Sequence, residues 1–340
     1  MASAVKAATL LQIGKETVRG TLVAATRRMT GGATVRRTMA QEMFEDEMYG
    51  VLARTARAPV ITANGFELEY TAPLSFEELL LPLLSGMKGA VTPTGAGADK
   101  TWTFTPGVAA DPVPDTFTVE WVESDFTNDQ EWEAGYAFTT GWGVKVGVTG
   151  LAELSVSMAA RKAVSSTKTA SVALPALNYA PALTWKVYVD DAWAGLGTTP
   201  VTGQVYGADW KFDTGIKPQT YLDGRAAVDF SQYEFGSRSA ELSLEAVVSP
   251  TAGIVIAEQA KKDTPALRFV RLELSGAALG GGTYKIQIDG AYYHAEDSLS
   301  ERGADRDGNM ITGMHLLSAY DPTGAQDVRV LVVNALTAYP

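Results

Sequence analysis

The stretch FELEY at 66–70 alternates apolar and acidic residues, and LSLEA at 242–246 repeats this alternation 176 positions later. Such alternation is typical of a β-strand with one buried face and one polar face. Each stretch is followed by a serine and then by an apolar segment, 76–84 in the first case and 252–260 in the second. A serine before an apolar segment predicts a capped short helix. The recurrence of strand and helix indicates an internal repeat.

Other elements extend this repeat over the chain. At the same offset, the alternating positions Leu154 and Val156 match Val330 and Val332. The segment 166–182 is rich in Ser, Thr, Ala and Pro, as a linker should be. Between helix and last strand, each half also has two β-rich runs, which are Thr101–Thr105 and Thr116–Val122, then Leu267–Leu274 and Tyr284–Asp289.

We therefore predict a mainly β fold with two tandem lobes, 1–165 and 183–340, joined by the linker 166–182. Each lobe should consist of packed antiparallel sheets with a short flanking helix. The alternative is that two unrelated β-sandwiches of one length share the same alternation by chance. Only the first half has apolar residues at helical spacing between Met39 and Leu52, which predicts an additional core or interface helix there.

Composition excludes several kinds of chemistry. The 340 residues include no cysteine and only two histidines, so thiol catalysis and His-rich or thiolate metal sites are excluded. Neither a phosphate-binding glycine loop nor a complete calcium-binding loop is present, and we expect no enzyme activity, cofactor or metal. The net charge of −11 argues against a protein that grips nucleic acid through a positive field.

Charge is distributed unevenly along the chain. Residues 1–40 contain seven Lys or Arg against the single acid Glu16, whereas 120–133 contains six acids and no base. A basic arm of this kind is able to touch nucleic acid, but the matched opposite charges favour contact between copies of the chain. We also find no secretion signal or membrane span in the sequence, so we expect a cytoplasmic product.

Four stretches carry a resemblance to a known family. They are GKETVRGT at 14–21, YKIQIDGAYY at 284–293, GNMITGMHLLSAYD at 308–321 and VRVLVVNAL at 328–336. With the strand, short helix and acidic loop of each half, they resemble the tail tube (major tail) protein of long-tailed bacteriophages. The resemblance covers nearly the whole chain, once per half, and so corresponds to a duplicated two-lobe form.

The resemblance implies a virion structural protein that self-assembles in the host cytoplasm into stacked rings of a phage tail. Three two-lobe chains would form each ring as a pseudo-hexamer, and genomic DNA would pass through the lumen during ejection without specific binding. It implies tail tip, terminator and tape-measure proteins as further partners, and no membrane. The alternatives are a six-chain ring with one lobe as decoration, or a surface β-sandwich adhesin, against which the missing secretion signal counts.

A conduit for DNA needs an inner wall that does not hold phosphates, so acidic residues on polar strand faces are suitable. The candidates for this wall are Glu67, Glu69, Glu153, Ser155, Glu245 and Arg329. The alternative is that these residues face the outer solvent, because alternation does not tell which face of a strand points inward. Stacked rings also need an axial contact, and long segments without obvious core roles are suitable. The candidates for this contact are Lys6, Leu10, Leu11, Arg27, Arg28, Glu123, Asp125, Phe126, Asp129, Glu131, Trp132, Glu133, Glu296, Asp297, Glu301, Asp305 and Asp307.

Overall fold

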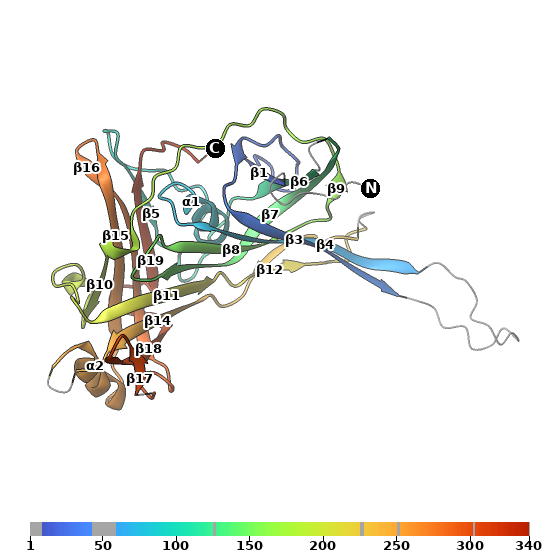
Figure 1. The fold of residues 1–340 in the computed structure, drawn as a ribbon. Helices are drawn as coiled ribbons and strands as arrows, with labels where there is room; N and C mark the ends of the chain where they lie inside the picture. Colours follow the sequence, from blue (N-terminus) through green and yellow to red (C-terminus); the bar gives the residue numbers. More distant parts are fainter. Residues whose placement is uncertain are drawn as a thin grey trace, which may run out of the picture.

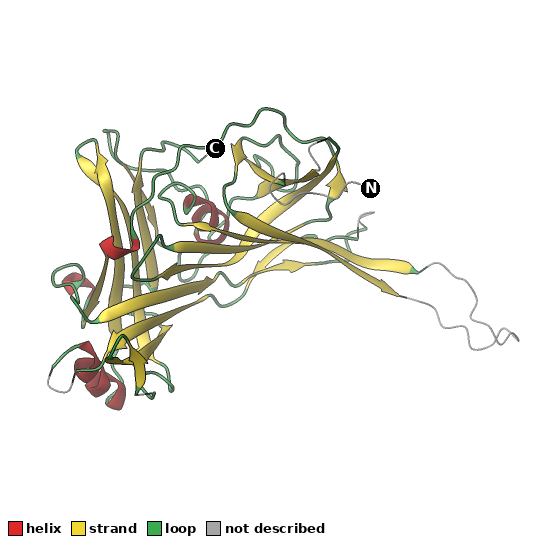
Figure 2. Ribbon diagram, in the orientation of Figure 1, coloured by secondary structure: helices red, strands yellow, loops and turns green. Residues whose placement is uncertain are grey.

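The computed structural model describes residues 9–42, 59–124, 127–224, 228–249, 252–301 and 303–339. Throughout these ranges strands dominate and helices are few (Figure 2). All the pairings between the strands are antiparallel. This confirms the predicted mainly β class with large antiparallel sheets.

The elements are named in chain order and labelled in Figure 1 where space allows. The strands are β1 (Leu10–Lys15), β2 (Arg27–Arg28), β3 (Gly32–Glu42), β4 (Val60–Pro73), β5 (Lys100–Phe104), β6 (Phe117–Ser124), β7 (Asp129–Val146), β8 (Glu153–Ala160), β9 (Val164–Ser165), β10 (Trp185–Asp190), β11 (Val205–Asp213), β12 (Ile216–Gln219), β13 (Gln232–Phe235), β14 (Ser239–Val247), β15 (Arg268–Leu279), β16 (Gly282–His294), β17 (Ala304–Arg306), β18 (Asn309–Ser318) and β19 (Val328–Asn334). The helical segments are α1 (Leu80–Pro82), η2 (Leu83–Met87), η3 (Ala182–Thr184), η4 (Trp193–Gly195) and α2 (Ile254–Asp263).

One long sheet crosses the whole molecule. Its strand order is β3–β4–β8–β7–β11–β14–β18–β17, and we call it the long sheet. The strands β3 and β4 extend from the body of the molecule (Figure 1). Alternation explains the packing of this sheet, because in β4 Phe66, Leu68 and Tyr70 are buried whereas Glu67 and Glu69 are exposed.

Two shorter sheets cover the apolar face of the long sheet. The first contains β1, β6, β7 and β9, and the second contains β10, β15, β16, β19 and β5. The strands of the second cross those of the long sheet steeply (Figure 1). Strand β7 spans 18 residues and belongs to both the long sheet and the first short sheet. A single hydrophobic cluster fills the space between the layers and draws residues from both halves of the chain.

The strand pairing scheme occurs twice. In the first half the order of pairing is β1–β6–β7–β8–β4–β3. In the second half the order is β10–β15–β16–β18–β14–β11. Each scheme includes a helical segment directly after the third of its strands in chain order, α1 with η2 after β4 and α2 after β14. The two halves therefore share this order of strand pairing.

The detailed match differs from the one that a constant offset of 176 predicts. Strand β8 was matched with β19 at Val330 and Val332, but its pairing partners correspond to those of β18. The offset also differs locally. Ser75 Oγ accepts from the Glu78 backbone N–H at 3.0 Å, and Ser249 Oγ accepts from that of Ala252 at 3.4 Å. Matching these two turns gives an offset of 174 for β4 and β14.

Two other predicted elements were wrong. Met39 belongs to β3 and not to a helix, and positions 43–52 of the predicted helix lie outside the described residues. The acidic segment 123–133 is a β-hairpin and not a long loop, since β6 continues to Ser124 and β7 begins at Asp129. Its alternating acids Glu131 and Glu133 lie in β7 between β6 and β9, where alternation places them on one side of the sheet.

The two halves are joined by more than the linker. Strand β7 pairs with β11, and β19 pairs with β5. At the first junction the rings of Trp142 and Trp210 lie 4.6 Å apart. Beside the second, buried Asn334 accepts from Trp102 Nε1 at 3.1 Å and donates to the carbonyl of Phe76 at 2.8 Å. Sheet and core continuity should make the halves unfold together.

We therefore predict that Trp142→Ala lowers the stability of the whole chain by about 3–5 kcal/mol, the usual effect of removing a buried Trp. Urea unfolding followed by far-UV and near-UV circular dichroism should give coincident single transitions for parent and variant. Leu183→Ala, at a side chain that is 77% exposed, is the matched control and should change little. Separate transitions for the two halves would contradict a shared core.

Candidate functional site

The outer face of the long sheet carries a regular array of polar side chains. Its side chains alternate with the core residues, so strands from both halves contribute to one continuous face. Exposed or half-buried polar residues on it are Arg36, Glu67, Glu69, Lys145, Glu153, Ser155, Ser157, Asp209, Lys211, Asp213, Glu241, Ser243 and Glu245. The hairpin β12–β13 covers one end of the face, packing Ile216 and Tyr233 against Phe138.

Five of the six predicted wall residues lie on this outer face. Glu67 and Glu69 are in β4, Glu153 and Ser155 are in β8, and Glu245 is in β14. The sixth, Arg329, does not. It is in β19 of the second short sheet, where its guanidinium donates to buried Asp289 at 2.6 Å. Alternation was correct for Arg329 too, but it could not tell which of two sheets a strand joins.

The outer face has an excess of carboxylates. Each of its cations lies near an acid: Arg36 is 3.8 Å from Glu67, and Lys211 is 3.6 Å from Asp209, which is also opposite Lys145 in the pairing of β7 with β11. Among the described residues, Arg306 forms one further ion pair with this face, to Glu245, and the other carboxylates outnumber the cations near them. The field above this face is therefore negative.

The ends of the long sheet differ from its interior. Among the described residues, β3 pairs only with β4, and β17 pairs only with β18. Strand β3 therefore has an outer edge of 11 residues with unpaired backbone groups. An edge of this length is a template for pairing with another chain unless it is covered.

The first predicted axial segment has partners inside the chain. Glu131 accepts from the backbone N–H of Lys168 at 2.9 Å, Glu133 accepts from Ser166 Oγ at 2.9 Å, and Asp129 contacts the Lys168 ammonium. These acids fasten the start of the linker to the β6–β7 hairpin. The pKa of Lys168 is raised by its hydrogen bonds to Asp129 and Glu131.

Of the other residues predicted for this segment, some have partners inside the chain and some lie outside the described residues. Glu123 accepts from Trp121 Nε1 at 3.2 Å, and Trp132 lies under the Arg37 guanidinium at 4.2 Å from its ring centre. Asp125 and Phe126 lie outside the described residues. A contact that uses this hairpin as a free acidic loop therefore lacks most of its proposed groups.

The predicted basic arm is largely part of the fold. Leu10 and Leu11 belong to β1, and Leu11 is buried in the core. Arg27 is also buried and lies 5.0 Å from the ring centre of Tyr339. Arg28 is half-buried in β2, and Lys6 lies outside the described residues. From residue 10 onward, the segment is built of strands and their connections.

The second acidic segment is exposed. Glu296, Asp297, Glu301, Asp305 and Asp307 are all exposed around the connection from β16 to β18. Among the described residues, Asp297 is the one member of this set whose carboxylate lies beside a basic side chain, since His315 Nδ1 lies 3.1 Å from its Oδ1. This segment keeps the free charge that the sequence analysis assigned to it.

A buried polar cluster that sequence reasoning missed holds the base of this segment. Arg268 donates to both carboxylate oxygens of Glu258 at 2.9 and 2.7 Å, and His294 Nε2 lies 3.1 Å from the same group. His294 Nδ1 lies 2.9 Å from Ser298 Oγ. The order Ser298–His294–Glu258 has the connectivity of a catalytic triad, but Ser298 is fully buried and its Oγ also accepts from the His315 N–H. The cluster therefore fastens α2 to the segment.

The charges of the cluster stabilise each other. Burial raises the pKa of Glu258, but hydrogen bonds from His294 and Arg268 outweigh it and hold this pKa below its usual value. Burial likewise lowers the pKa of Arg268, and its bonds to Glu258 outweigh that effect. No sequence motif marks such a cluster, because its members come from a helix, two strands and a turn.

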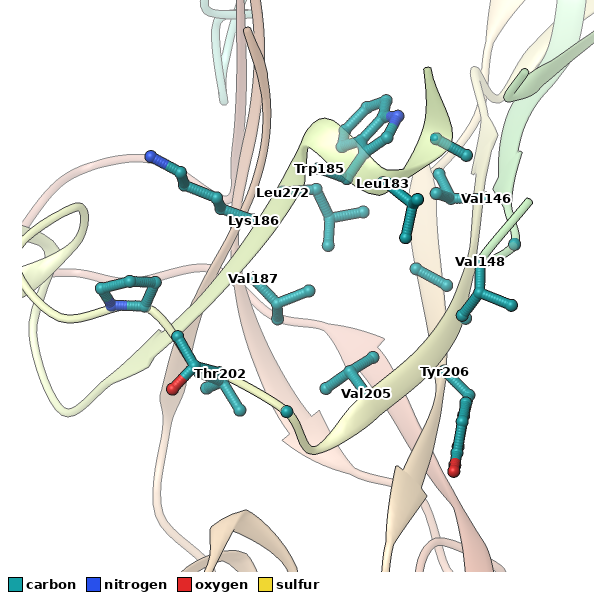
Figure 3. A pocket seen from close by; sticks show the side chains of 17 residues that line it. Val146, Val148, Leu183, Trp185, Lys186, Val187, Thr202, Val205, Tyr206 and Leu272 are labelled. Atoms are coloured by element: carbon teal, nitrogen blue, oxygen red, sulfur yellow. The ribbon is translucent and has the colours of Figure 1, made fainter. Parts of the chain in front are cut away.

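An apolar pocket of about 340 Å³ lies where the two halves meet. Figure 3 shows Val146 and Val148, from the end of β7 and the residues after it, on one side of this pocket, with Val187 and Val205 of β10 and β11 across from them. A second pocket of about 670 Å³ is lined by Leu10, Leu11, Ala33 and Trp121 together with Arg28 and other neighbours.

In the ranges that the structure describes, no three His, Asp or Glu side chains are grouped so that they would hold a metal ion. No described helix has both the length and the apolar character needed to cross a bilayer. In comparisons with known proteins, no family model matches the sequence and no curated protein matches it significantly.

The buried cluster generates a prediction about pH. Because the Glu258 pKa is lower in the folded chain than its ordinary 4.5, the ionised group stabilises the fold above that pH and loses this effect as the pH falls below it. Glu258→Gln should therefore lower the free energy of unfolding by about 3–5 kcal/mol at pH 7. The difference from the parent should shrink below pH 4.5.

Urea titrations at a series of pH values measure this difference. Glu241→Gln, on the exposed face of β14, is the control and should change stability by less than about 0.5 kcal/mol at every pH. An effect of Glu258→Gln that stays constant down to pH 3.5 would contradict the assigned ion pair.

Proposed function

We propose that this chain is the tail tube subunit of a long-tailed bacteriophage, a non-enzymatic structural protein that assembles into stacked rings. The observation that carries the proposal is the long sheet, in which the recurring topology is joined edge to edge within one chain and ends in an unpaired strand at each side. A sheet that already joins two copies of one unit side by side has the contact that a closed ring repeats.

The proposal regards each half as one tube lobe, 1–165 and 183–340, with 166–182 as the linker. Three chains then supply six lobes, the pseudo-hexamer implied by the resemblance. A ring of six chains, with one lobe of each as decoration, is not favoured, because β7 and β11 place both halves in the same sheet. A surface adhesin is also less well supported, since it does not use the free edges.

The dimensions of such a ring suit a conduit. Within the described residues the long sheet contains eight strands, so three chains supply twenty-four. With strands about 4.8 Å apart and tilted by about 40°, a closed barrel of that size is about 48 Å across between backbones. Inward side chains leave a bore of about 35–40 Å by the same geometry, enough for a DNA duplex to pass.

The acidic outer face would line this bore. Its apolar side is covered by the two short sheets, so only the polar face is available to the lumen. Excess carboxylate repels the phosphates of DNA and leaves the duplex free to slide. Self-association, tail tip, terminator and tape-measure proteins, and transient DNA are the proposed partners, and the tail of the virion, assembled in host cytoplasm, is the proposed location.

Assembly gives the first test of this function. Purified protein examined by negative-stain electron microscopy should form rings or tubes with a central bore, and native mass spectrometry of the ring should give three chains. Rings of six chains would overturn the two-lobe assignment and leave a tube function standing. Monodisperse single chains under all salt and concentration conditions would contradict the proposed function.

The charge of the bore gives a second test. Glu67→Lys combined with Glu69→Lys should convert part of the wall from repulsive to attractive, so assembled tubes should retain duplex DNA with affinity that falls steeply with salt. Asp99→Lys combined with Asp263→Lys changes the charge equally at two sites off the long sheet. A gel-shift assay of assembled tubes at moderate salt measures the difference. Equal retention by both variants would contradict the assignment of the wall.

A further inference from the structure

We propose that a second copy of this chain supplies β17 as the strand that pairs with the outer edge of β3. This inference rests on the proposed function and names the surfaces that close its ring. It also changes the role of Asp305 and Asp307, which the sequence analysis assigned to contact between rings. The argument uses the junction already present inside the chain as its template.

The template is the pairing of β7 with β11. It is antiparallel over six residue pairs, and it places Lys145 opposite Asp209 and Val146 opposite Ala208. Strand β7 contributes the edge of the first half, and β11 contributes the edge of the second half. Closing a ring requires the same kind of contact between two copies of the chain. There the second half of one copy contributes the counterpart of β7, and the first half of the next copy contributes the counterpart of β11.

The counterpart of β11 is β3. Each is the neighbour of its half's long central strand, β14 or β4. In the second half Asp209 lies opposite Ser243, and in the first half Thr34 lies opposite Glu69. Glu69 and Ser243 differ by 174, the offset given by the matched serine turns. Thr34 therefore occupies in β3 the position that Asp209 occupies in β11.

The counterpart of the end of β7 is β17. Across the sheet, one residue of β8 lies between Lys145 and Pro73 of β4. In the second half, one residue of β18 lies in the same way between Ala304 and Val247 of β14. Pro73 and Val247 also differ by 174. Ala304 therefore occupies the position of Lys145, and the template places Ala304 of one copy opposite Thr34 of the next.

The two pockets described above also indicate that β17 of a second copy pairs with the edge of β3. The pocket of Figure 3 is lined by Val187, Ala208 and Leu272, and Val146 at the end of β7 and Val148 after it lie on one side of it. The wider pocket is the first-half counterpart of this site, because its position relative to β1, β3 and β6 is the same. Among the described residues, no strand lines it at the place that β7 has in the other pocket.

The wider pocket has the features expected of an open half-site. It is lined by Leu11, Ala33 and Trp121, which take the places that Val187, Ala208 and Leu272 have in the pocket of Figure 3. The template directs the residue after Ala304, Asp305, toward these residues in the place of Val146. Arg28 lines the pocket and offers a cation to this carboxylate, although Glu123 of the same wall limits the gain.

Both strands of the proposed contact are accessible. Thr34 and Ala304 are exposed, and neither β3 nor β17 has a second strand partner among the described residues. The contact is heterologous, since β17 and β3 lie at opposite ends of the long sheet. It therefore cannot be satisfied in a twofold dimer that buries one patch against itself, and it propagates until a ring closes.

Cysteine cross-linking tests the pairing directly, because the chain has no cysteine of its own. The double variant Thr34→Cys, Ala304→Cys should form disulfides between copies under mild oxidation, since directly opposite residues bring their Cβ atoms to about 4.5–5.5 Å. A non-reducing denaturing gel should show monomer, dimer and a final covalent trimer. Reduction should return all of them to monomer.

Two matched variants control the result. Lys145→Cys with Asp209→Cys repeats the pair inside one chain and should close without any increase in mass. Thr34→Cys with Gly313→Cys moves the second thiol from β17 into β18 and should not cross-link. If rings form but the Thr34–Ala304 variant stays monomeric while the intrachain control closes, this pairing is overturned and the proposed function survives. If the parent forms no rings, the proposed function itself fails.

Discussion

An antiparallel strand that pairs on only one side leaves a row of backbone N–H and C=O groups without hydrogen-bond partners in the sheet. Strand β3 has this form over 11 residues, at one end of a sheet that runs through the whole chain. The same kind of edge inside the chain, that of β11, is satisfied by β7. The rest of the structure depends on this constraint, because the pairing of β7 with β11 unites the two halves. In the proposed ring the same pairing is the pattern for joining further copies.

Rigidity of the sheet is what would make such an edge useful. The junction of the halves is buttressed by the contact of Trp142 with Trp210 and by the bonds of Asn334 to the other half. The linker is held down as well, since buried Glu120 accepts from both the backbone N–H and the hydroxyl of Thr169 at 2.8 and 2.6 Å. Acidic residues of the negatively charged segment 120–133 thus form hydrogen bonds inside the chain, and these bonds help to fix the relative position of the halves.

Much of the fold follows from local patterns. The alternation in FELEY and LSLEA correctly predicted strands with one polar face, and serine turns correctly predicted where helical segments follow. Five of six wall candidates share a face for the same reason. Arg329 shows the limit, because alternation is a property of one strand, whereas membership of a sheet depends on distant partners.

The remaining errors have a related cause. Helical spacing around Met39 described a strand that has few core contacts, where burial does not enforce a period of two. The acidic hairpin at 123–133 looked like a loop because one face of its strands carries acidic residues that bind the linker and do not pack in the core. The cluster of Glu258, Arg268 and His294 had no signature, since long-range pairing brings it together.

Amide hydrogen exchange tests the central claim most directly. If β17 of a neighbouring copy pairs with the edge of β3, the β3 amides close to Thr34 that do not bond to β4 should exchange rapidly in the single chain and slowly in the assembled state. Amides of β11, already paired on both sides, should be protected in both states. Assembled particles in which those β3 amides still exchange as fast as in the single chain would contradict the account.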